Sequence, residues 1–153
     1  MVDWQGIYGE LSQNFSPWLP WRGISGYDFM QHPGVYLFAE LPDDTVPPSV
    51  VDASILYIGE TTRQTLLARF IQFEEAARTG CKNRHFGGQK YFARTKGDLV
   101  AESCRLLPDD FYIAVFPITL EEPERSAHIR YTERAALWYF VKANNRYPRC
   151  NAM

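Results

Sequence analysis

The chain has 153 residues, of which 46% are hydrophobic and 22% are charged, and its formal net charge is −2. A chain of this size predicts one domain that buries a core without disulfides or a structural metal. No stretch approaches the roughly 18 to 20 apolar residues that span a bilayer, so no membrane partner is expected.

Cysteine usage and the first residues indicate the compartment. Cys81, Cys104 and Cys150 are far apart in the sequence, and the first residues lack a basic and apolar leader. These features favour reduced thiols in a cytoplasmic protein. Cys81 and His85 have the spacing of half a zinc site, but no second ligand pair follows them.

Charge is distributed unevenly along the chain. Basic residues are in excess in segments 63–105 and 125–153, and acidic residues are in excess elsewhere. Two basic segments on one face would suit a nucleic-acid partner, although solvated helix surfaces explain the same pattern equally well.

In chain order, residues 1–32 are expected to form an accessory N-terminal segment with a short helix within 4–15. Residues 34–41 and 54–59 are rich in β-branched and aromatic types, which predicts an antiparallel hairpin joined by the loop 42–53. A helix should then run over 63–78, with Thr61 or Thr62 as its N-cap and Gly80 at its end.

The second half of the chain predicts three further elements. A basic loop over 81–98 contains a short helix near 89–94, residues 110–119 form a third strand, and Pro123 begins a long helix that ends near Asn145. This order predicts an α+β domain over 33–153, with a small three-stranded antiparallel sheet flanked by helices.

The long helix carries an acid in an unusual position. At 100° per residue, five mostly apolar side chains lie within about 60° of Glu133, namely Ile129, Ala136, Leu137, Phe140 and Asn144. A carboxylate near the centre of an apolar stripe needs a cation, a hydrogen-bond donor or a cleft. A metal ligand and a buried ion pair, including one with Arg69, both remain open.

Other polar residues lie on neighbouring elements. Arg69 lies at the edge of the apolar stripe of the helix 63–78, where it can reach solvent or hold a phosphate. Tyr36 and Tyr57 lie on the two hairpin strands, and each hydroxyl needs a partner if buried. His85 lies in a basic, glycine-containing stretch that suits a phosphate contact or a proton carrier.

These residues form an ordered series that resembles the GIY-YIG nuclease superfamily. The series begins with Gly34-Val35-Tyr36 and Leu56-Tyr57-Ile58-Gly59 and continues with Leu66-x-x-Arg69, Glu133 in a helix, and Asn151 after Pro148. The tripeptide Gly6-Ile7-Tyr8 also matches the family name, but no strand pattern follows it. The sequence departs from some family members in having Glu60 where a lysine occurs and Phe73 where a histidine occurs.

The resemblance implies a metal-dependent endonuclease that hydrolyses DNA phosphodiester bonds with one divalent ion, Mg²⁺ or Mn²⁺, held by Glu133. It implies active-site roles for Tyr36, Tyr57, Arg69, His85, Glu133 and Asn151. We expect the DNA backbone to be contacted by a set of basic residues, namely Arg63, Lys82, Arg84, Lys90, Arg94 and Lys96. The general base is left open between Tyr36, Tyr57 and His85.

Two other functions remain as alternatives. One is a DNA-binding module of the same fold without catalytic activity, and the other is a protein-interaction domain. The chain has no evident second domain that reads DNA sequence, so specificity would come from its own loops, from a homodimer or from a partner protein.

Overall fold

A computed structural model describes residues 1, 3–41, 46–79, 85–95, 107 and 109–151. Its sheet has four antiparallel strands in the order β1-β4-β2-β3, formed by β1 (Leu19–Pro20), β2 (Gly34–Glu40), β3 (Ile55–Thr61) and β4 (Phe111–Pro117). The expected hairpin is confirmed, because β2 pairs antiparallel with β3 from Gly34↔Thr61 onward.

The α+β class is confirmed, but the prediction of three strands is wrong. The fourth strand is β1, which pairs with β4 through Leu19↔Ile113 and Pro20↔Tyr112. A two-residue strand that contains a proline has no alternating pattern, and proline in a sheet is confined to such edge positions. Sequence periodicity therefore could not detect it.

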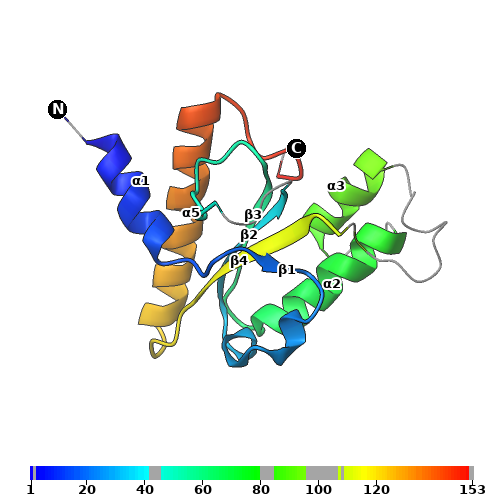
Figure 1. The fold of residues 1–153 in the computed structure, drawn as a ribbon. Coiled ribbons are helices and arrows are strands. Elements are labelled where there is room, and N and C mark those ends of the chain that lie inside the picture. The colour runs from blue at the N-terminus through cyan, green and yellow to red at the C-terminus, as the bar shows by residue number, and fades with distance from the viewer. Residues whose placement is uncertain (2, 42–45, 80–84, 96–106, 108, 152–153) are drawn as a thin grey trace.

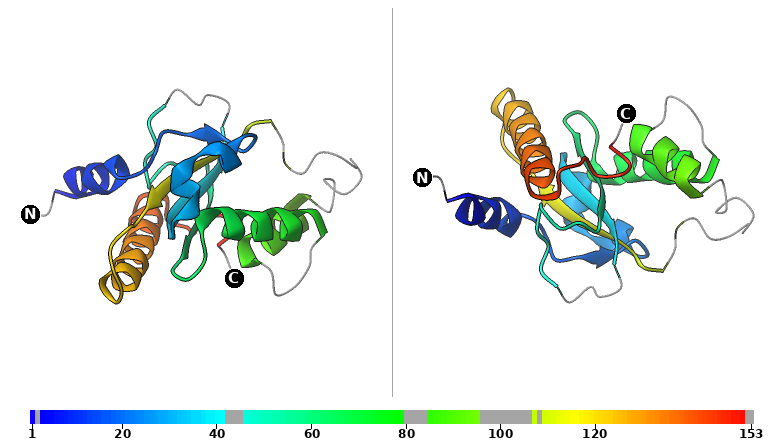
Figure 2. Two further views of the ribbon diagram at one scale, coloured as in Figure 1. Left: turned by 90° about the horizontal axis from the view of Figure 1, so that it is seen from below. Right: turned by 90° about the horizontal axis from the view of Figure 1, so that it is seen from above.

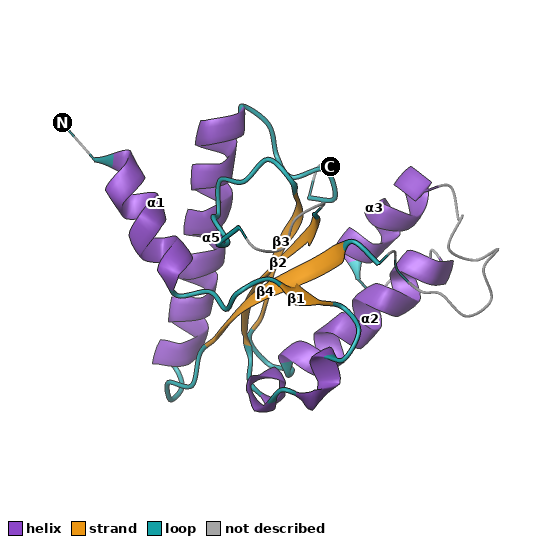
Figure 3. Ribbon diagram, in the orientation of Figure 1, coloured by secondary structure: helices purple, strands orange, loops and turns teal. Residues whose placement is uncertain are grey.

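Four α-helices flank the sheet within the described residues: α1 (Trp4–Gln13), α2 (Leu66–Thr79), α3 (Phe86–Thr95) and α5 (Glu124–Asn144). Short 3-10 turns η1 (Ile24–Gly26) and η2 (Asp28–Gln31) precede β2. The helices α1 and α5 lie on one side of the strands and α2 and α3 on the other (Figure 1, Figure 3), and Figure 2 shows the same two layers from above and below. None of the described helices is long and apolar enough to cross a membrane.

Helix ends follow local hydrogen-bonding groups. The Thr65 hydroxyl accepts a hydrogen bond from the Ala68 N–H, so α2 begins at Leu66, three residues later than expected. Thr61, an expected cap, instead closes the turn before the helix by accepting from the Gln64 N–H. Helix α5 ends where Asn145 adopts a left-handed conformation with φ of 54°, which asparagine tolerates well.

The two faces of the sheet bury different side chains. The face under α2 and α3 is largely aromatic and includes Tyr36, Phe38, Phe70 and Phe73. Trp21 packs on this cluster, with its ring centroid 5.6 Å from that of Phe38. The N-terminal segment thus shares the core of the domain that follows it.

The face under α5 is largely aliphatic. It buries Val35, Leu37 and Ile58 of the strands with Ile129, Ala136 and Phe140 of α5 and with Trp18. The stripe predicted around Glu133 therefore does face the sheet, because it contains the buried residues of α5.

Candidate active site

Arg69 of α2 is the electrostatic centre of a cluster of polar groups. Burial is the largest influence on the pKa values of Tyr36, Tyr57 and His85, and the Arg69 guanidinium also lowers the pKa of all three groups. Hydrogen bonding to Arg69 adds to this lowering for Tyr36. Its Nη1 also donates to Gln72 Oε1 at 2.8 Å, one turn further along the helix. The guanidinium of Arg69 thus lies near side chains of β2, of β3 and of the residue before α3.

His85, which is 1% exposed, holds the Tyr36 hydroxyl from the α3 side. The Tyr36 hydroxyl oxygen lies 2.7 Å from His85 Nε2, and the Gly88 N–H donates to His85 Nδ1 at 3.2 Å. Because Nδ1 accepts a hydrogen bond, the proton of the neutral ring belongs on Nε2, which then donates to Tyr36. The Tyr36 oxygen is therefore an acceptor for both His85 and Arg69, and its own proton is directed elsewhere.

The protonation states of this cluster follow from burial. Burial, with a further contribution from Arg69, lowers the pKa of His85 to about 2, so the ring is neutral at physiological pH. Burial and the neighbouring Tyr57 raise the pKa of Tyr36 well above its usual value. Burial raises the pKa of Tyr57 to about 12, despite the opposing charge of Arg69. Both tyrosines therefore keep their protons near neutral pH.

Glycines leave room for the Tyr57 ring. A Cβ at Gly59 would lie 2.4 Å from Tyr57 Cε1 and 2.7 Å from the Tyr36 hydroxyl, and a Cβ at Gly87 would lie 2.6 Å from Tyr57 Cδ2. These distances are below ordinary contact, so any side chain at 59 or 87 would displace the ring. The absence of a side chain at Gly59, the last residue of Tyr57-Ile58-Gly59, thus has a steric reason.

Glu133 approaches the cluster from the other face of the sheet. Its charge raises the pKa of Tyr57, after burial and Arg69, so the acid and the tyrosine are electrostatic neighbours across β3. The Glu133 side chain is 15% exposed and borders a groove of about 480 Å³. Its carboxylate forms an ion pair with the adjacent Arg134, with Nε 3.3 Å from Oε2.

A second carboxylate lies close to Glu133. Burial raises the pKa of Glu133, Arg134 opposes the rise, and the negative charge of Glu60 adds to it. Glu60 Oε2 is itself buried and has no hydrogen-bond partner among the described residues. Glu60 follows Gly59 on β3 and pairs with Val35 of β2. Because paired residues on neighbouring strands point to the same face and Val35 packs under α5, Glu60 lies on the α5 side of the sheet.

The oxygen atoms of these two acids suit a hard divalent cation. Mg²⁺ and Mn²⁺ prefer carboxylate oxygen and water, and a buried carboxylate oxygen without a donor is an acceptor that a cation or its bound water can satisfy. Neither this site nor any other place in the part of the chain that the structure describes brings together three or more acidic, histidine or cysteine side chains that could hold a metal ion. The donor set therefore fits an ion that draws most ligands from water and substrate.

Asn151 binds the edge of the sheet. Its Oδ1 accepts from the Ile58 N–H at 2.8 Å, and its Nδ2 donates to the Ile58 carbonyl at 2.9 Å. The Cys150 N–H also donates to the Leu56 carbonyl at 2.8 Å. The C-terminal segment thus covers the outer edge of β3 and holds the strand that carries Tyr57. This geometry gives Asn151 the role of supporting the strand beside the candidate site.

The expected DNA contacts are only partly described. Arg63 and Arg94 are exposed, while Lys90 is half-buried with its Nζ 5.3 Å from the centroid of the Phe86 ring. Lys82, Arg84 and Lys96 lie outside the described residues, as do Cys81 and Cys104. The remaining cysteine, Cys150, is buried as a free thiol.

The structure brings most of the expected residues together. Tyr36, Tyr57, Arg69 and His85 form one cluster, Glu133 lies at its border, and Asn151 supports the strand between them. Sequence reasoning noted Glu60 only as a departure from a pattern. A glutamate at the end of a run of largely apolar strand residues was the signal that could have identified it as part of the site.

Comparisons with known proteins do not identify the chain. No family model, curated protein or solved structure matches it.

Proposed function

We propose that the chain is a metal-dependent endonuclease of the GIY-YIG type, which hydrolyses DNA phosphodiester bonds with one divalent ion. The observation that carries the proposal is the common position of Tyr36, Tyr57, Arg69 and His85 beside Glu133. These five side chains come from four separate secondary-structure elements and the residue that precedes α3. Such a cluster offers what phosphodiester hydrolysis requires, namely a cation, oriented hydroxyls and an acid.

Glu133 would hold Mg²⁺ or Mn²⁺, and Glu60 would accept hydrogen bonds from the water around the ion. When bound, the ion would supply positive charge against the phosphate and the leaving 3′ oxygen. Because one carboxylate and a neighbouring acid leave most coordination positions to water and substrate, metal affinity without DNA should be weak.

Arg69 would bind the non-bridging oxygens of the scissile phosphate. A guanidinium presents paired donors to a phosphate and keeps its charge at every relevant pH. Its hydrogen bond with Tyr36 also places this charge beside the hydroxyl that would meet the attacking water.

Tyr36 would orient the attacking water with its own proton, because its oxygen already accepts from His85 and Arg69. A tyrosine that keeps its proton is poorly suited to remove one, so the proposal gives Tyr36 and Tyr57 orienting roles. His85 would position Tyr36, since the ring is neutral and its Nε2 proton is engaged. The water would lose its proton to solvent or to a group of the substrate.

The test is a nicking assay on supercoiled plasmid DNA, with and without Mg²⁺. The proposal predicts nicked or linear products with Mg²⁺, none with EDTA, and none from Glu133→Gln in either condition. A chain that binds the plasmid but never cuts it would instead be a DNA-binding module. A chain that neither binds nor cuts DNA at low salt would leave the protein-interaction domain as the better account.

A further inference from the structure

A groove along α5 shares a wall with the candidate metal ligand. It encloses about 480 Å³, which is within the range of small-ligand sites. Its lining comes from α5 and from the segment after it, and consists of Glu133, Arg134, Leu137, Trp138, Val141 and Tyr147. A molecule in this groove would therefore touch the acid directly.

Two large aromatic rings of the groove are exposed. Trp138 is 59% exposed and Tyr147 is 56% exposed. Neither ring contacts another aromatic ring within the described residues, in contrast to the dense ring contacts of the core. Leu137 and Val141 add apolar surface to the lining of the groove. Two exposed rings over an apolar surface mark a site for a flat, apolar ligand group.

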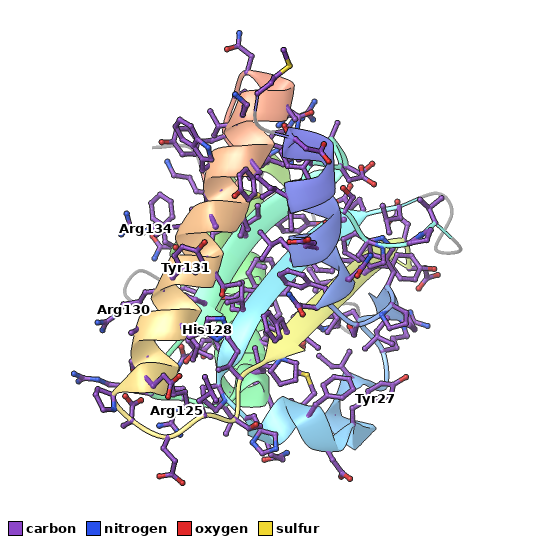
Figure 4. The ribbon with its side chains drawn as sticks, turned by 90° about the vertical axis from the view of Figure 1, so that its left-hand side faces the viewer. Tyr27, Arg125, His128, Arg130, Tyr131 and Arg134 are labelled. Carbon is purple, nitrogen blue, oxygen red and sulfur yellow. The ribbon has the colours of Figure 1, made fainter. Side chains whose placement is uncertain are left out.

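One cation and one anion line the groove, Arg134 and Glu133. The Arg134 side chain is 84% exposed and lies four residues before Trp138, on the same side of the helix. Figure 4 shows Arg130 and Arg134 along the outer rim of α5. Glu133 is the only acidic residue in the segment 125–153, which contains six basic residues. The groove thus combines two aromatic rings with one exposed arginine, which together suit a ligand with a flat ring and a phosphate.

We infer that Trp138 and Tyr147 bind an unpaired nucleobase next to the phosphate that Glu133 and Arg69 would hold, an inference that rests on the proposed function. Inside a duplex both faces of a base are covered by its neighbours, so only a single-stranded, frayed or flipped base can stack on a protein ring. The preferred substrate class is therefore DNA with unpaired nucleotides beside the cut, such as tailed or flapped duplexes.

The test measures binding in EDTA, so that it does not require cleavage. A fluorescent hairpin duplex with a single-stranded thymidine tail is compared with the same hairpin with a blunt end, and tails are placed on the 3′ and 5′ ends in separate probes. The wild-type chain should bind one tailed probe more tightly than the blunt probe. Trp138→Ala should weaken tailed binding about ten-fold and blunt binding little, because one stacked base is lost.

Two variants separate ring stacking from general damage. Trp138→Phe keeps an aromatic face and should retain most of the preference for the tail. Tyr27→Ala removes an exposed ring from the residue between η1 and η2, far from Arg134 in Figure 4, and should bind both probes as the wild type does. Far-ultraviolet circular dichroism confirms that each variant is folded.

Three results would overturn the inference: equal binding of tailed and blunt probes by the wild type, unchanged tailed binding by Trp138→Ala, or a dimer that Trp138→Ala dissociates. The last result would make the groove a contact between copies of the chain. Cleavage with Mg²⁺ separates this inference from the proposed function. If binding of the tailed probe depends on Trp138 but no DNA is cut, the inference about the groove holds and the nuclease proposal fails. If DNA is cut at a rate that depends on neither the tail nor Trp138, the nuclease proposal holds and the inference about the groove fails.

Discussion

The two faces of the sheet differ in how their buried polar groups are hydrogen-bonded. On the aromatic face, polar side chains are paired: Tyr36 with His85, Trp21 with Glu74 at 2.7 Å, and Tyr91 with Glu40 at 2.8 Å. On the aliphatic face, Glu60 Oε2, Trp18 Nε1 and His128 Nδ1 are buried without a partner among the described residues.

This difference corresponds to two tasks that the proposed catalytic site would have to perform. Donors that are fixed before substrate arrives stabilise developing charge without the cost of rearranging, and the Arg69 cluster has this character. A buried acceptor without a partner costs free energy unless something else binds it. The acids near α5 therefore carry the features of a ligand site, and the contrast between faces can be tested by removing groups from each.

The largest effect should come from removing the charge of Glu133. Glu133→Gln should lower the rate of Mg²⁺-dependent DNA cleavage by more than about 100-fold, because a bound ion supplies several kcal/mol of transition-state stabilisation. Burial raises the pKa of this acid, so its neutral analogue should not destabilise the fold. Single-turnover cleavage and urea unfolding measure the two quantities, and Glu121→Gln, an exposed acid, is the control. A rate close to that of the wild type would remove Glu133 from the reaction.

Removing the cation of the aromatic face should be nearly as severe. Arg69→Ala should lower the cleavage rate by about 100-fold, as expected for the loss of a preorganised donor to phosphate. Arg69→Lys should recover only part of it, since an ammonium cannot reproduce the paired donors. The control is Arg78→Ala, an exposed arginine in the last turn of the same helix. Equal losses from Arg69→Ala and Arg78→Ala would indicate a general effect of charge.

The buried His85 should make stability depend on pH. Burial lowers the pKa of His85 to about 2, whereas an unfolded histidine titrates near 6.5. Below about pH 6.5 the unfolded chain binds a proton that the folded protein excludes, so the free energy of unfolding falls by up to about 1.4 kcal/mol per pH unit. His85→Gln should be less stable by about 1 to 3 kcal/mol at pH 7 and should lack this dependence. The free energies of unfolding of the two proteins are measured with urea from pH 7 to 4.5. The same change with pH in both proteins would contradict the account.

A smaller effect should come from filling the space beside the tyrosines. Gly59→Ala should destabilise the fold by about 1 to 3 kcal/mol, because its Cβ would overlap the rings of Tyr36 and Tyr57. Gly9→Ala is the matched control, since nothing lies within 4 Å of a Cβ there and alanine favours the helix α1 by about 1 kcal/mol. Thermal unfolding measures both, and a neutral Gly59→Ala would mean that the rings move freely.

Much of the fold was predictable because its signals are local. The hairpin strands and the long helix were placed within a few residues, and Pro123, which was expected to begin the long helix, is the residue directly before α5. The start of α2 was misplaced because Thr61, Thr62 and Thr65 are all competent caps by residue type, and only the tertiary structure selects Thr65.

Most residues of the candidate site could be named from the sequence, but neither the part that Glu60 plays in it nor the contacts between the residues could be. The apolar stripe of α5 identified Glu133, whereas nothing local showed that it approaches Tyr57 from the opposite face of the sheet. His85 has the sequence surroundings of an exposed loop residue, yet it is buried against Tyr36 and the Gly88 N–H. Such contacts depend on side chains far apart in the sequence, which periodicity and propensity do not encode.

The most direct test of the account is a crystal structure with Mn²⁺ and thymidine 3′,5′-bisphosphate. The account predicts an anomalous Mn²⁺ peak about 2.2 Å from a Glu133 carboxylate oxygen, with a phosphate oxygen bound to both the ion and Arg69. Mn²⁺ bound away from Glu133, or a phosphate that leaves Arg69 untouched, would contradict it.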